Sequence, residues 1–480
     1  MRGFMIQIIC KETLYVYNLY HLTKAFFPHD EIETRVDTEQ EPQALLKIEG
    51  GSCFCIAEPE LTGMAESQQR KQYLTGRWYD YLVTLTGKKL AWGMLTGVRP
   101  TKLAMQAIEQ GKTSEEITEM LLGEYRISQE KATLGVDIAK REREILSTLD
   151  LVDGFSLYIG IPFCPTICSY CSFGSAAIEQ WCGRTDQYLT ALCKEIEAIG
   201  RMTRGKKLNT IYIGGGTPTT LEVHQLEQLL QLIDRTFTQE SLREYTIEAG
   251  RPDTITPEKL AVIRSFPVTR ISINPQSMQQ QTLDAIGRLH TVTEVKEAFY
   301  LARECGFDNI NMDLIAGLPG EGIEKMQDTL QQIEALNPDS LTVHALAIKR
   351  AAKYGQNKEA MNIEPEIEEM LKVSKQAAVR LNMKPYYLYR QKNIAGNFEN
   401  VGYAKAGKAG IYNIIIMEEK QTILAAGAGA MTKIVLPDKI KLKNDKETSL
   451  IRVENAKDIE TYIDRIDEMI ERKGEKWLCR

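Results

Sequence analysis

The stretch YIGIPFCPTICSYCSFGS, residues 158–175, decides how the rest of this chain is interpreted. It opens with an apolar run typical of a buried β-strand and continues into a short loop that carries Cys164, Cys168 and Cys171 in a C-x3-C-x2-C pattern. Thiolates are the usual ligands of iron–sulfur clusters, and a loop this short lets three of them converge. We therefore expect a 4Fe-4S cluster directly after this strand.

The number of cysteines indicates what this cluster does. A fourth thiolate would saturate the irons, whereas three leave one iron open to chelate the amine and carboxylate of S-adenosylmethionine (SAM). Electron donation from the cluster then cleaves the sulfonium and yields a 5'-deoxyadenosyl radical that abstracts hydrogen. A zinc or structural redox site is the alternative, but zinc sites usually recruit a fourth Cys or His nearby and none follows. His290 and His344 come much later and are expected at a barrel mouth or in the core.

Short apolar runs alternate with longer helical patterns from about residue 155 to residue 350. Strands are predicted at 156–161, 210–215, 245–250, 269–274, 310–316 and 340–347. Six strand-then-helix units in series require parallel strands, and right-handed crossovers curl such a sheet into a barrel or partial barrel. The predicted fold is therefore an α/β partial TIM-type barrel, with its chemistry at the carboxyl ends of the strands.

Further polar and glycine-rich motifs fall at these strand ends. Gly214, Gly215 and Gly216, followed by Thr217, end the second strand. Glycines let backbone groups approach a ligand closely, and free N–H and C=O groups there can hold the amino group of SAM. An ordinary turn between strand and helix is the alternative.

Carboxylates and other polar side chains end the later strands. Glu248, Gln276 and Asp313 interrupt apolar runs, and Arg288 follows soon after Gln276. A buried carboxylate is costly unless it is paired, so Glu248 and Asp313 need donors such as ribose hydroxyls or an ammonium. Mutual pairing with arginines across the barrel is the alternative.

The flanking regions divide the chain into three predicted domains. Residues 1–150 begin β-rich and turn helical from about residue 70, which predicts an N-terminal α+β domain. Residues 151–352 form the barrel, and residues 353–480 are predicted to form a mixed α/β C-terminal domain or cover. Its features are a helix near 365–381, the Gly-rich AAGAGAM at 425–431 and an amphipathic helix near 456–472.

Composition narrows the class of protein. The chain has 480 residues, 43% hydrophobic and 26% charged, and no apolar run long enough for a membrane span or a signal peptide. We expect a cytoplasmic protein. The net charge of -6 offers no electrostatic case for nucleic acid. Without export, disulfides are not expected, and the other seven cysteines are interpreted as buried or incidental thiols.

Several motifs together resemble one family. YIGIPFCPTICSYC, YIGGGTPT, TIEAGRPDTIT, RISINPQSM, IGRLH and NMDLIAGLPG match, in order, motifs of the oxygen-independent coproporphyrinogen III oxidase-like radical SAM family. The segments LTGVRPTKL and PYYLYRQKNIAGNFENVGYAKAG extend the resemblance to its HemZ subgroup, the HemZ-type coproporphyrinogen dehydrogenases. The resemblance implies a radical SAM barrel with one or two SAM molecules.

The resemblance also implies roles for individual residues. Cys164, Cys168 and Cys171 would bind the cluster, and Tyr158 and Glu248 a first SAM. We expect Tyr158, Glu248 and Arg288 to be catalytic. Family members that bind two SAM molecules contact one or the other of them from a further set of positions. The matching residues here are Tyr170, Gly215, Gly216, Thr217, Gln276, Arg288, Asp313 and Ala347.

The family's reaction converts two propionates of coproporphyrinogen III to the vinyl groups of protoporphyrinogen IX, an anaerobic step of heme and porphyrin biosynthesis. It implies a tetrapyrrole substrate and an electron donor such as flavodoxin or ferredoxin. Because this substrate carries four carboxylates, basic residues are candidate clamps. They are Arg251, Lys349, Arg350 and Arg390, and each is equally interpretable as a surface charge.

Two departures from the family pattern keep other functions open. Phe173 stands where the oxidase has a further cysteine. The related heme chaperones carry a His-Asn pair where this chain has Tyr412 and Asn413. The hypotheses are therefore an oxygen-independent coproporphyrinogen III dehydrogenase, a heme-binding chaperone of the same fold, and a radical SAM enzyme acting on another tetrapyrrole.

Overall fold

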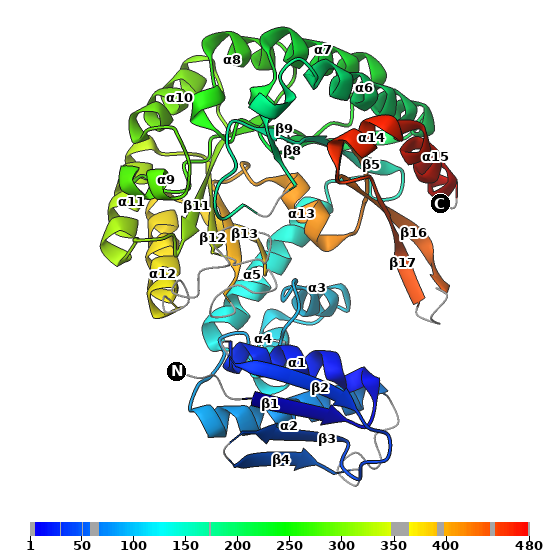
Figure 1. Cartoon of the computed structure of the whole chain (residues 1–480), viewed down its shortest axis with the longest axis vertical. Helices are drawn as coiled ribbons and strands as arrows, with labels where there is room; N and C mark the ends of the chain where they lie inside the picture. The colour runs from blue at the N-terminus through cyan, green and yellow to red at the C-terminus, as the bar shows by residue number, and fades with distance from the viewer. Residues whose placement is uncertain are drawn as a thin grey trace. The chain divides into compact units, whose positions relative to one another are not determined.

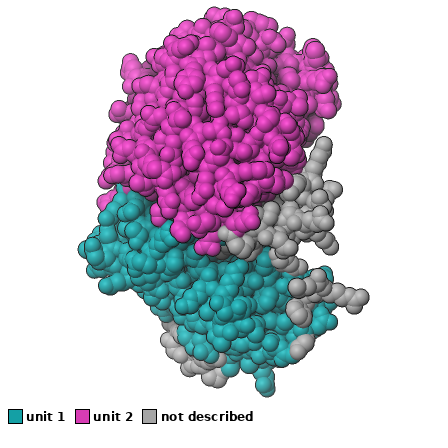
Figure 2. Space-filling model, turned by 90° about the vertical axis from the view of Figure 1, so that its left-hand side faces the viewer, with its two compact units in different colours: residues 1–140, 389–398 teal, residues 141–388, 399–480 magenta. Residues whose placement is uncertain are grey.

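The computed structural model describes residues 5–28, 30–49, 51–57, 67–171, 174–346, 364–390, 398–441 and 447–478. The chain divides into two compact units, which Figure 2 colours separately. Unit 1 comprises residues 1–140 with 389–398, and unit 2 comprises residues 141–388 with 399–480. None of the described helices is long and apolar enough to span a bilayer.

Unit 1 contains a four-stranded sheet in the order β2-β1-β3-β4. Its strands are β1 (Met5–Cys10), β2 (Glu31–Val36), β3 (Ala44–Ile48) and β4 (Ser52–Ile56). Buried residues alternate along β1, so one face meets the core formed with α1 (Thr13–Phe26) and α2 (Ser67–Thr86). Within this core the indole N–H of Trp78 donates to the hydroxyl of Thr23 at 2.9 Å. The sequence patterns predicted β1, β3 and β4 but missed α1 and β2.

Shorter helices follow in the same unit, α3 (Lys102–Glu109) and α4 (Ser114–Gly123). Thr113 and Glu116 cap the start of α4 reciprocally, each side chain bonding the backbone N–H of the other. Helix α5 (Gln129–Leu146) then crosses the boundary into unit 2. The helical character expected between residues 70 and 149 is therefore confirmed.

Unit 2 is built on six parallel strands that lie side by side in chain order. They are β5 (Gly154–Ile161), β8 (Lys207–Gly215), β9 (Glu244–Glu248), β10 (Arg270–Ser272), β11 (Ile310–Ala316) and β12 (Ser340–Ala345). Seven of the eight residues of β5 are buried, as expected for a strand covered on both faces. All six predicted strands are confirmed.

Helices cover the outer side of this sheet, which follows an arc in Figure 1. They are α6 (Thr185–Met202), α7 (Val223–Thr236), α8 (Pro257–Arg264), α10 (Val292–Glu304) and α11 (Ile323–Leu336), with the short α9 (Gln280–Ala285) after β10. The described strands end at β13 on one edge and at β17 on the other, so the sheet does not close. The predicted partial barrel is confirmed.

Residues after 363 extend the same sheet at both edges. Following α12 (Glu364–Arg380), β13 (Lys384–Tyr389) and β14 (Asn400–Ala404) continue it beyond β12. On the other edge β15 (Thr422–Ala426) pairs in parallel with β5, and β16 (Met431–Lys441) and β17 (Glu447–Glu454) follow it. Helix α13 (Ile411–Glu418) lies inside the arc, and α14 (Ile459–Asp464) and α15 (Ile466–Trp477) pack on α6.

A buried polar network fastens this C-terminal part to the barrel. The ammonium of Lys473 in α15 pairs with the carboxylate of Glu195 in α6, and both side chains are buried. Glu195 also accepts hydrogen bonds from Tyr462 at 2.6 Å, from Asn455 at 2.9 Å and from the backbone N–H of Gly427 at 2.9 Å. Each carboxylate oxygen is thus satisfied, which is the condition for burying a charge.

Candidate active site

The cysteine loop follows β5 and is held by backbone hydrogen bonds. Its first cysteine, Cys164, ends the two-residue strand β6 (Phe163–Cys164), which pairs with β7 (Ala176–Ala177). The N–H of Cys171 donates to the carbonyl of Cys168 at 3.1 Å, and the N–H of Ser169 donates to Ile286 at 3.0 Å. All three thiols are partly buried. The predicted loop is therefore a folded turn anchored to the segment after β10.

The glycine run at the end of β8 packs directly against this loop. A Cβ at Gly216 would lie 2.5 Å from the carbonyl oxygen of Phe163, so no larger residue fits without a shift of backbone. The N–H groups of Gly216 and Thr217 donate to the carbonyls of Ile161 and Phe163, both at 2.7 Å. The expectation that these two N–H groups are free for a ligand is therefore wrong.

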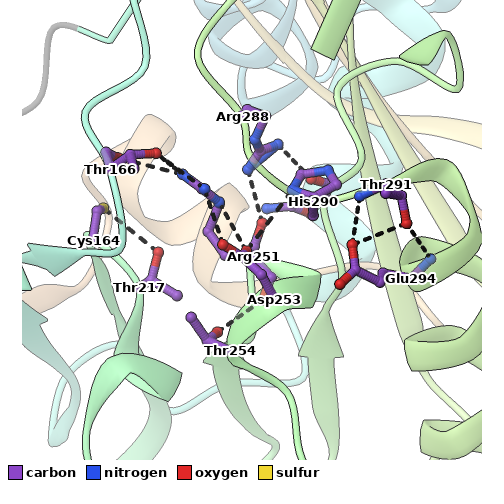
Figure 3. Close-up of polar contacts among 12 residues, drawn as sticks. Cys164, Thr166, Thr217, Arg251, Asp253, Thr254, Arg288, His290, Thr291 and Glu294 are labelled. Atoms are coloured by element: carbon purple, nitrogen blue, oxygen red, sulfur yellow. Dashed lines mark hydrogen bonds and ion pairs between the residues drawn. The ribbon is translucent and has the colours of Figure 1, made fainter. Parts of the chain in front are cut away.

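The hydroxyl of Thr217 connects the glycine run to the cysteines. It donates to Sγ of Cys164 at 3.5 Å, as Figure 3 shows. Gly215 has φ of +105°, and a Cβ there would lie 3.1 Å from the hydroxyl of Tyr158. Cys164, Gly215 and Thr217 therefore lie together at the carboxyl ends of β5 and β8, and the hydroxyl of Tyr158 lies beside Gly215.

Three tyrosines stack inside the barrel beside this edge. The ring of Tyr212 lies 4.5 Å from that of Tyr412 and 6.2 Å from that of Tyr158. Burial, followed by the charge of Glu248, raises the pKa of Tyr158 above its ordinary range, so its hydroxyl stays protonated. Sequence reasoning missed Tyr212, although it is the partner of Tyr158 in the β5–β8 register.

Glu248 ends β9 and accepts a hydrogen bond from the hydroxyl of Tyr212. Burial raises the pKa of Glu248 to about 7, with the Tyr212 hydrogen bond opposing the shift and the charge of Asp313 adding to it. This carboxyl therefore exchanges its proton near neutral pH. A nearby cation would favour the charged form.

Asp313 lies on β11 in a different environment. Burial acts to raise its pKa, but His344 and hydrogen bonds from Asn311 and Thr342 outweigh it, and the pKa of Asp313 is lowered. Nδ2 of Asn311 is 2.7 Å from Oδ1 of Asp313, and Nε2 of His344 is 3.8 Å from Oδ2. The partly buried His344 thus lies at the barrel mouth, as expected. Two interacting carboxyls therefore have separated pKa values, with Glu248 at the end of β9 and Asp313 in the middle of β11.

Gln276 lies beside Asp313 in a left-handed backbone conformation, with φ of 67°. Its N–H donates to the carbonyl of Asp313 at 2.9 Å, and its carbonyl accepts from Ile315 at 3.0 Å. A non-glycine residue held in this region costs energy that the surrounding hydrogen bonds must offset, and such residues cluster at functional sites. The two predicted residues are therefore brought together by backbone pairing.

The guanidinium of Arg288 joins the ends of β9 and β10. It is buried and donates to the carbonyls of Asn274 at 2.6 Å and of Gly250 at 3.0 Å. Burial raises the pKa of Tyr170, and the charge of Arg288 partly offsets this rise. The predicted residues Arg288 and Tyr170 are therefore neighbours, but two nitrogens of Arg288 are already engaged by backbone.

Comparison with known proteins agrees with this arrangement. A model of the radical SAM superfamily matches residues 158–333. The oxygen-independent coproporphyrinogen-III oxidase-like protein HemZ of Bacillus subtilis is 42% identical over 422 residues, which cover 86% of this chain and 82% of that protein. The chain belongs to this family of radical SAM proteins. The family resemblance predicted from the motifs is confirmed.

Other relatives of this radical SAM chain carry different names. The heme chaperone HemW of Bacillus subtilis is 32% identical over 278 residues, which cover 57% of this chain and 70% of that protein. Among solved structures, coproporphyrinogen III oxidase (HemN) from Escherichia coli has a TM-score of 0.53 at 22% identity and covers 68% of this chain and 73% of that one. This last match establishes the shared fold.

Membership of the radical SAM superfamily implies a 4Fe-4S cluster and SAM, and the cysteine loop fits the cluster. No three His, Cys, Asp or Glu side chains surround a single ion in the part of the chain that the structure describes. In a 4Fe-4S cluster each thiolate binds a different iron, so the three cysteines do not need to surround one ion. Burial raises the pKa of Cys164, hydrogen bonds with Thr217 and Ser175 oppose the rise, and the charges of Cys171 and Cys168 add to it. Bound iron would counteract this rise.

The predicted carboxylate clamps of this radical SAM protein are not supported. The guanidinium of Arg251 is buried and pairs with the carboxylate of Asp253, as Figure 3 shows. Arg390, in unit 1, is also buried and donates a hydrogen bond to the carbonyl of Leu95 at 2.7 Å. Both donors are engaged inside the protein. Ala347, Lys349, Arg350 and Phe173 lie outside the described residues.

His290 is a core residue, as expected, and adjoins the same cluster of charges. Burial lowers the pKa of His290 to about 3, and the charges of Arg288 and Arg251 add to the shift. Its Nδ1 lies 3.8 Å from Oδ1 of Asp253. The imidazole is therefore neutral at physiological pH, and its place in the IGRLH motif reflects packing beside the cysteine loop.

Tyr412 and Asn413 lie at the start of α13. The backbone N–H of Tyr412 donates to the carboxylate of Glu244 at 3.1 Å, and Nδ2 of Asn413 donates to the hydroxyl of Tyr386 at 3.2 Å. Glu244 thus caps α13 from strand β9 and holds the ring of Tyr412 against Tyr212. Sequence reasoning singled out Tyr412 only for the histidine it replaces, and missed this contact.

Proposed function

We propose that this chain is an oxygen-independent coproporphyrinogen III dehydrogenase, which converts coproporphyrinogen III to protoporphyrinogen IX. The observation that carries the proposal is that the cysteine loop, the glycine run and Glu248 gather at the ends of neighbouring strands, with Asp313 of β11 close enough to act on Glu248. The resemblance to HemZ over most of both chains supports the choice of substrate.

The proposed reaction removes a carboxyl group and one hydrogen atom from each of two propionate side chains. When bound, the cluster and SAM would supply the radical chemistry that removes a hydrogen atom from the propionate β-carbon, which leaves 5'-deoxyadenosine. One electron then passes to an acceptor, the carboxylate leaves as carbon dioxide, and the two side-chain carbons become a vinyl group. We propose flavodoxin or ferredoxin as the electron donor to the cluster.

The protein's own residues would bind and orient SAM. We propose that Cys164, Cys168 and Cys171 hold the cluster. Glu248, charged once a cation approaches, fits the ammonium of SAM together with carbonyl oxygens of the glycine run. Asp313, whose pKa is lowered by His344 and its hydrogen-bond donors against the effect of burial, fits ribose hydroxyls.

The remaining predicted contacts belong to the same proposal. Tyr170 offers its hydroxyl beside Cys168, Tyr158 offers its hydroxyl beside Gly215, and Gln276 is held beside Asp313 by backbone hydrogen bonds. Because the buried guanidinium of Arg288 spans the ends of two strands, we propose that it fixes their spacing under the adenosyl group. One or two SAM molecules are compatible with these donors.

A heme-binding chaperone of the same fold is the second candidate, favoured by the identity to HemW. Against it, the position of the chaperones' histidine holds Tyr412, whose ring is buried in the tyrosine stack. A phenol with a pKa raised by burial is a poor ligand for heme iron at neutral pH. A radical SAM enzyme for another tetrapyrrole is the third.

One experiment separates the three functions. The full chain is reconstituted anaerobically with iron, sulfide, reductant and SAM, supplied with coproporphyrinogen III or heme, and the products are identified by mass. Loss of two carboxyl groups with formation of 5'-deoxyadenosine supports the dehydrogenase. Stoichiometric heme binding without decarboxylation supports the chaperone, and a modified heme supports the third function. Either of the last two results overturns the proposal.

A further inference from the structure

We propose that Arg251 is a positioning residue that raises the reduction potential of the iron–sulfur cluster by directing one guanidinium nitrogen at Cys168. The inference rests on the cluster that the family membership implies and not on the choice of tetrapyrrole. Arg251 follows β9 in the RPD turn, and the residue is only 2% exposed. A guanidinium buried this deeply needs a full set of partners.

The partners of Arg251 divide its nitrogens into two groups. Nε and Nη2 form a fork with Oδ1 and Oδ2 of Asp253, both at 3.2 Å. Nη1 takes no part in this fork and lies 3.8 Å from Sγ of Cys168. The carboxylate therefore lies on the edge of the guanidinium away from Nη1, and the sulfur meets the nitrogen that Asp253 leaves uncovered.

The same nitrogen also reaches the backbone of the cysteine loop. Nη1 donates to the carbonyl of Thr166 at 3.3 Å and to its hydroxyl at 3.2 Å, and Nη2 reaches that hydroxyl at 3.1 Å, as drawn in Figure 3. Thr166 and Cys168 are two residues apart. The guanidinium is thereby fixed in the position that faces the sulfur.

The turn that carries Arg251 is itself rigid. The carbonyl of Arg251 accepts hydrogen bonds from the N–H of Thr254 at 3.0 Å and from the hydroxyl of Thr254 at 2.7 Å. The hydroxyl of Thr254 also lies 2.6 Å from that of Thr219. The neighbouring His290 is neutral and adds no charge. The direction of the guanidinium is therefore set by fixed neighbours rather than by solvent.

Anchoring the cysteine loop does not by itself require Arg251. The loop has other anchors, because Thr166 donates to the carbonyl of Gly287 at 3.0 Å and Ser169 donates to that of Ile286 at 3.0 Å. What Arg251 adds is a positive group at a cluster ligand. Hydrogen bonds and charge at the ligand sulfurs set cluster potentials, and a cation stabilises the more negative, reduced cluster.

The test is a redox titration of the reconstituted full-length protein without SAM or tetrapyrrole, followed by electron paramagnetic resonance. We expect Arg251→Gln to bind the same amount of iron and sulfide but to lower the equilibrium constant for one-electron reduction about tenfold, which is about 59 mV toward more negative potential. Arg251→Lys, which keeps the charge but loses the fork, should fall between Arg251→Gln and the wild type.

Arg270→Gln is the matched control. Arg270 begins β10, is also 2% exposed, and donates to Asn309 at 3.0 Å and to the carbonyl of Lys408 at 2.9 Å, with no cysteine as partner. The cluster in Arg270→Gln should have the same reduction potential as the cluster in the wild type. An unchanged potential in Arg251→Gln overturns the proposal, and so does loss of the cluster from both Arg251 variants. Because no tetrapyrrole is added, the result does not depend on the proposed reaction.

Discussion

The hydroxyl of Tyr212 donates its hydrogen bond to the carboxylate of Glu248, and the two side chains come from neighbouring parallel strands. Both side chains are partly buried, one beside the glycine run and one at the end of β9. This pair sets the charge at the place where we propose that the ammonium of SAM binds. Its protonation is therefore the first property to test.

Replacing Tyr212 by Phe should make SAM binding more dependent on pH. Burial raises the pKa of Glu248 to about 7, and the Tyr212 hydrogen bond opposes that rise. Without the bond the pKa rises further, so the carboxylate becomes charged only at higher pH. Isothermal titration of SAM under anaerobic conditions should show affinity reaching its plateau at higher pH than in the wild type.

The control for this variant is Tyr245→Phe. Tyr245 is buried on the adjoining strand, and its hydroxyl has no hydrogen-bond partner within the described segments. It should leave the pH profile unchanged. Identical profiles for Tyr212→Phe and the wild type would remove Glu248 from the proposed SAM site.

Replacing Cys168 by Ala should abolish SAM cleavage after reconstitution, because only two of the proposed thiolate ligands remain. The readout is 5'-deoxyadenosine formed in the presence of a reductant. Cys193→Ala is the matched control, since Cys193 lies partly buried on α6, outside the cysteine loop. Full cleavage by Cys168→Ala would refute the cluster assignment.

Replacing Gly216 by Ala should impair cluster assembly. The added Cβ would lie 2.5 Å from the carbonyl oxygen of Phe163 and 2.8 Å from that of Ile161, which are backbone atoms that cannot rotate away. We expect iron content per chain to fall by at least half after reconstitution. Gly123→Ala, where no atom lies within 4 Å, should keep full iron content. Equal iron content in both variants would show that the loop tolerates the shift.

Replacing Lys473 by Met should lower the thermal unfolding midpoint. The substitution leaves the carboxylate of Glu195 buried without its cation, which costs about 3–5 kcal/mol. Adding Glu195→Gln removes the uncompensated charge and should recover part of the loss. The anaerobic melting curves of the two variants decide the point, and an unchanged midpoint in Lys473→Met would contradict it.

The sequence predicted what depends on local pattern. Six βα units, the turn glycines and the cysteine loop follow from periodicity and from spacing within short segments. Periodicity did not show that residues after 363 continue the sheet at both edges, because the pairing of β15 with β5 joins residues more than 250 positions apart.

The roles of the arginines were unpredictable for the same reason. Asp253 is close to Arg251 in sequence, but Thr166 and Cys168 are more than 80 residues away. A substrate carboxylate and an internal partner attract a guanidinium equally, so residue type alone cannot decide between them. The tyrosine stack likewise depends on α13, whose position inside the arc no local pattern specifies.

The position of β15 has a consequence for biosynthesis. Strand β5 is made early, yet the strand that covers its outer edge is not made until residues 422–426. Until then, the nascent chain leaves an apolar strand with unpaired backbone groups beside the cysteine loop, the kind of edge that recruits other chains. This edge of the barrel can therefore be completed only after most of the chain has left the ribosome.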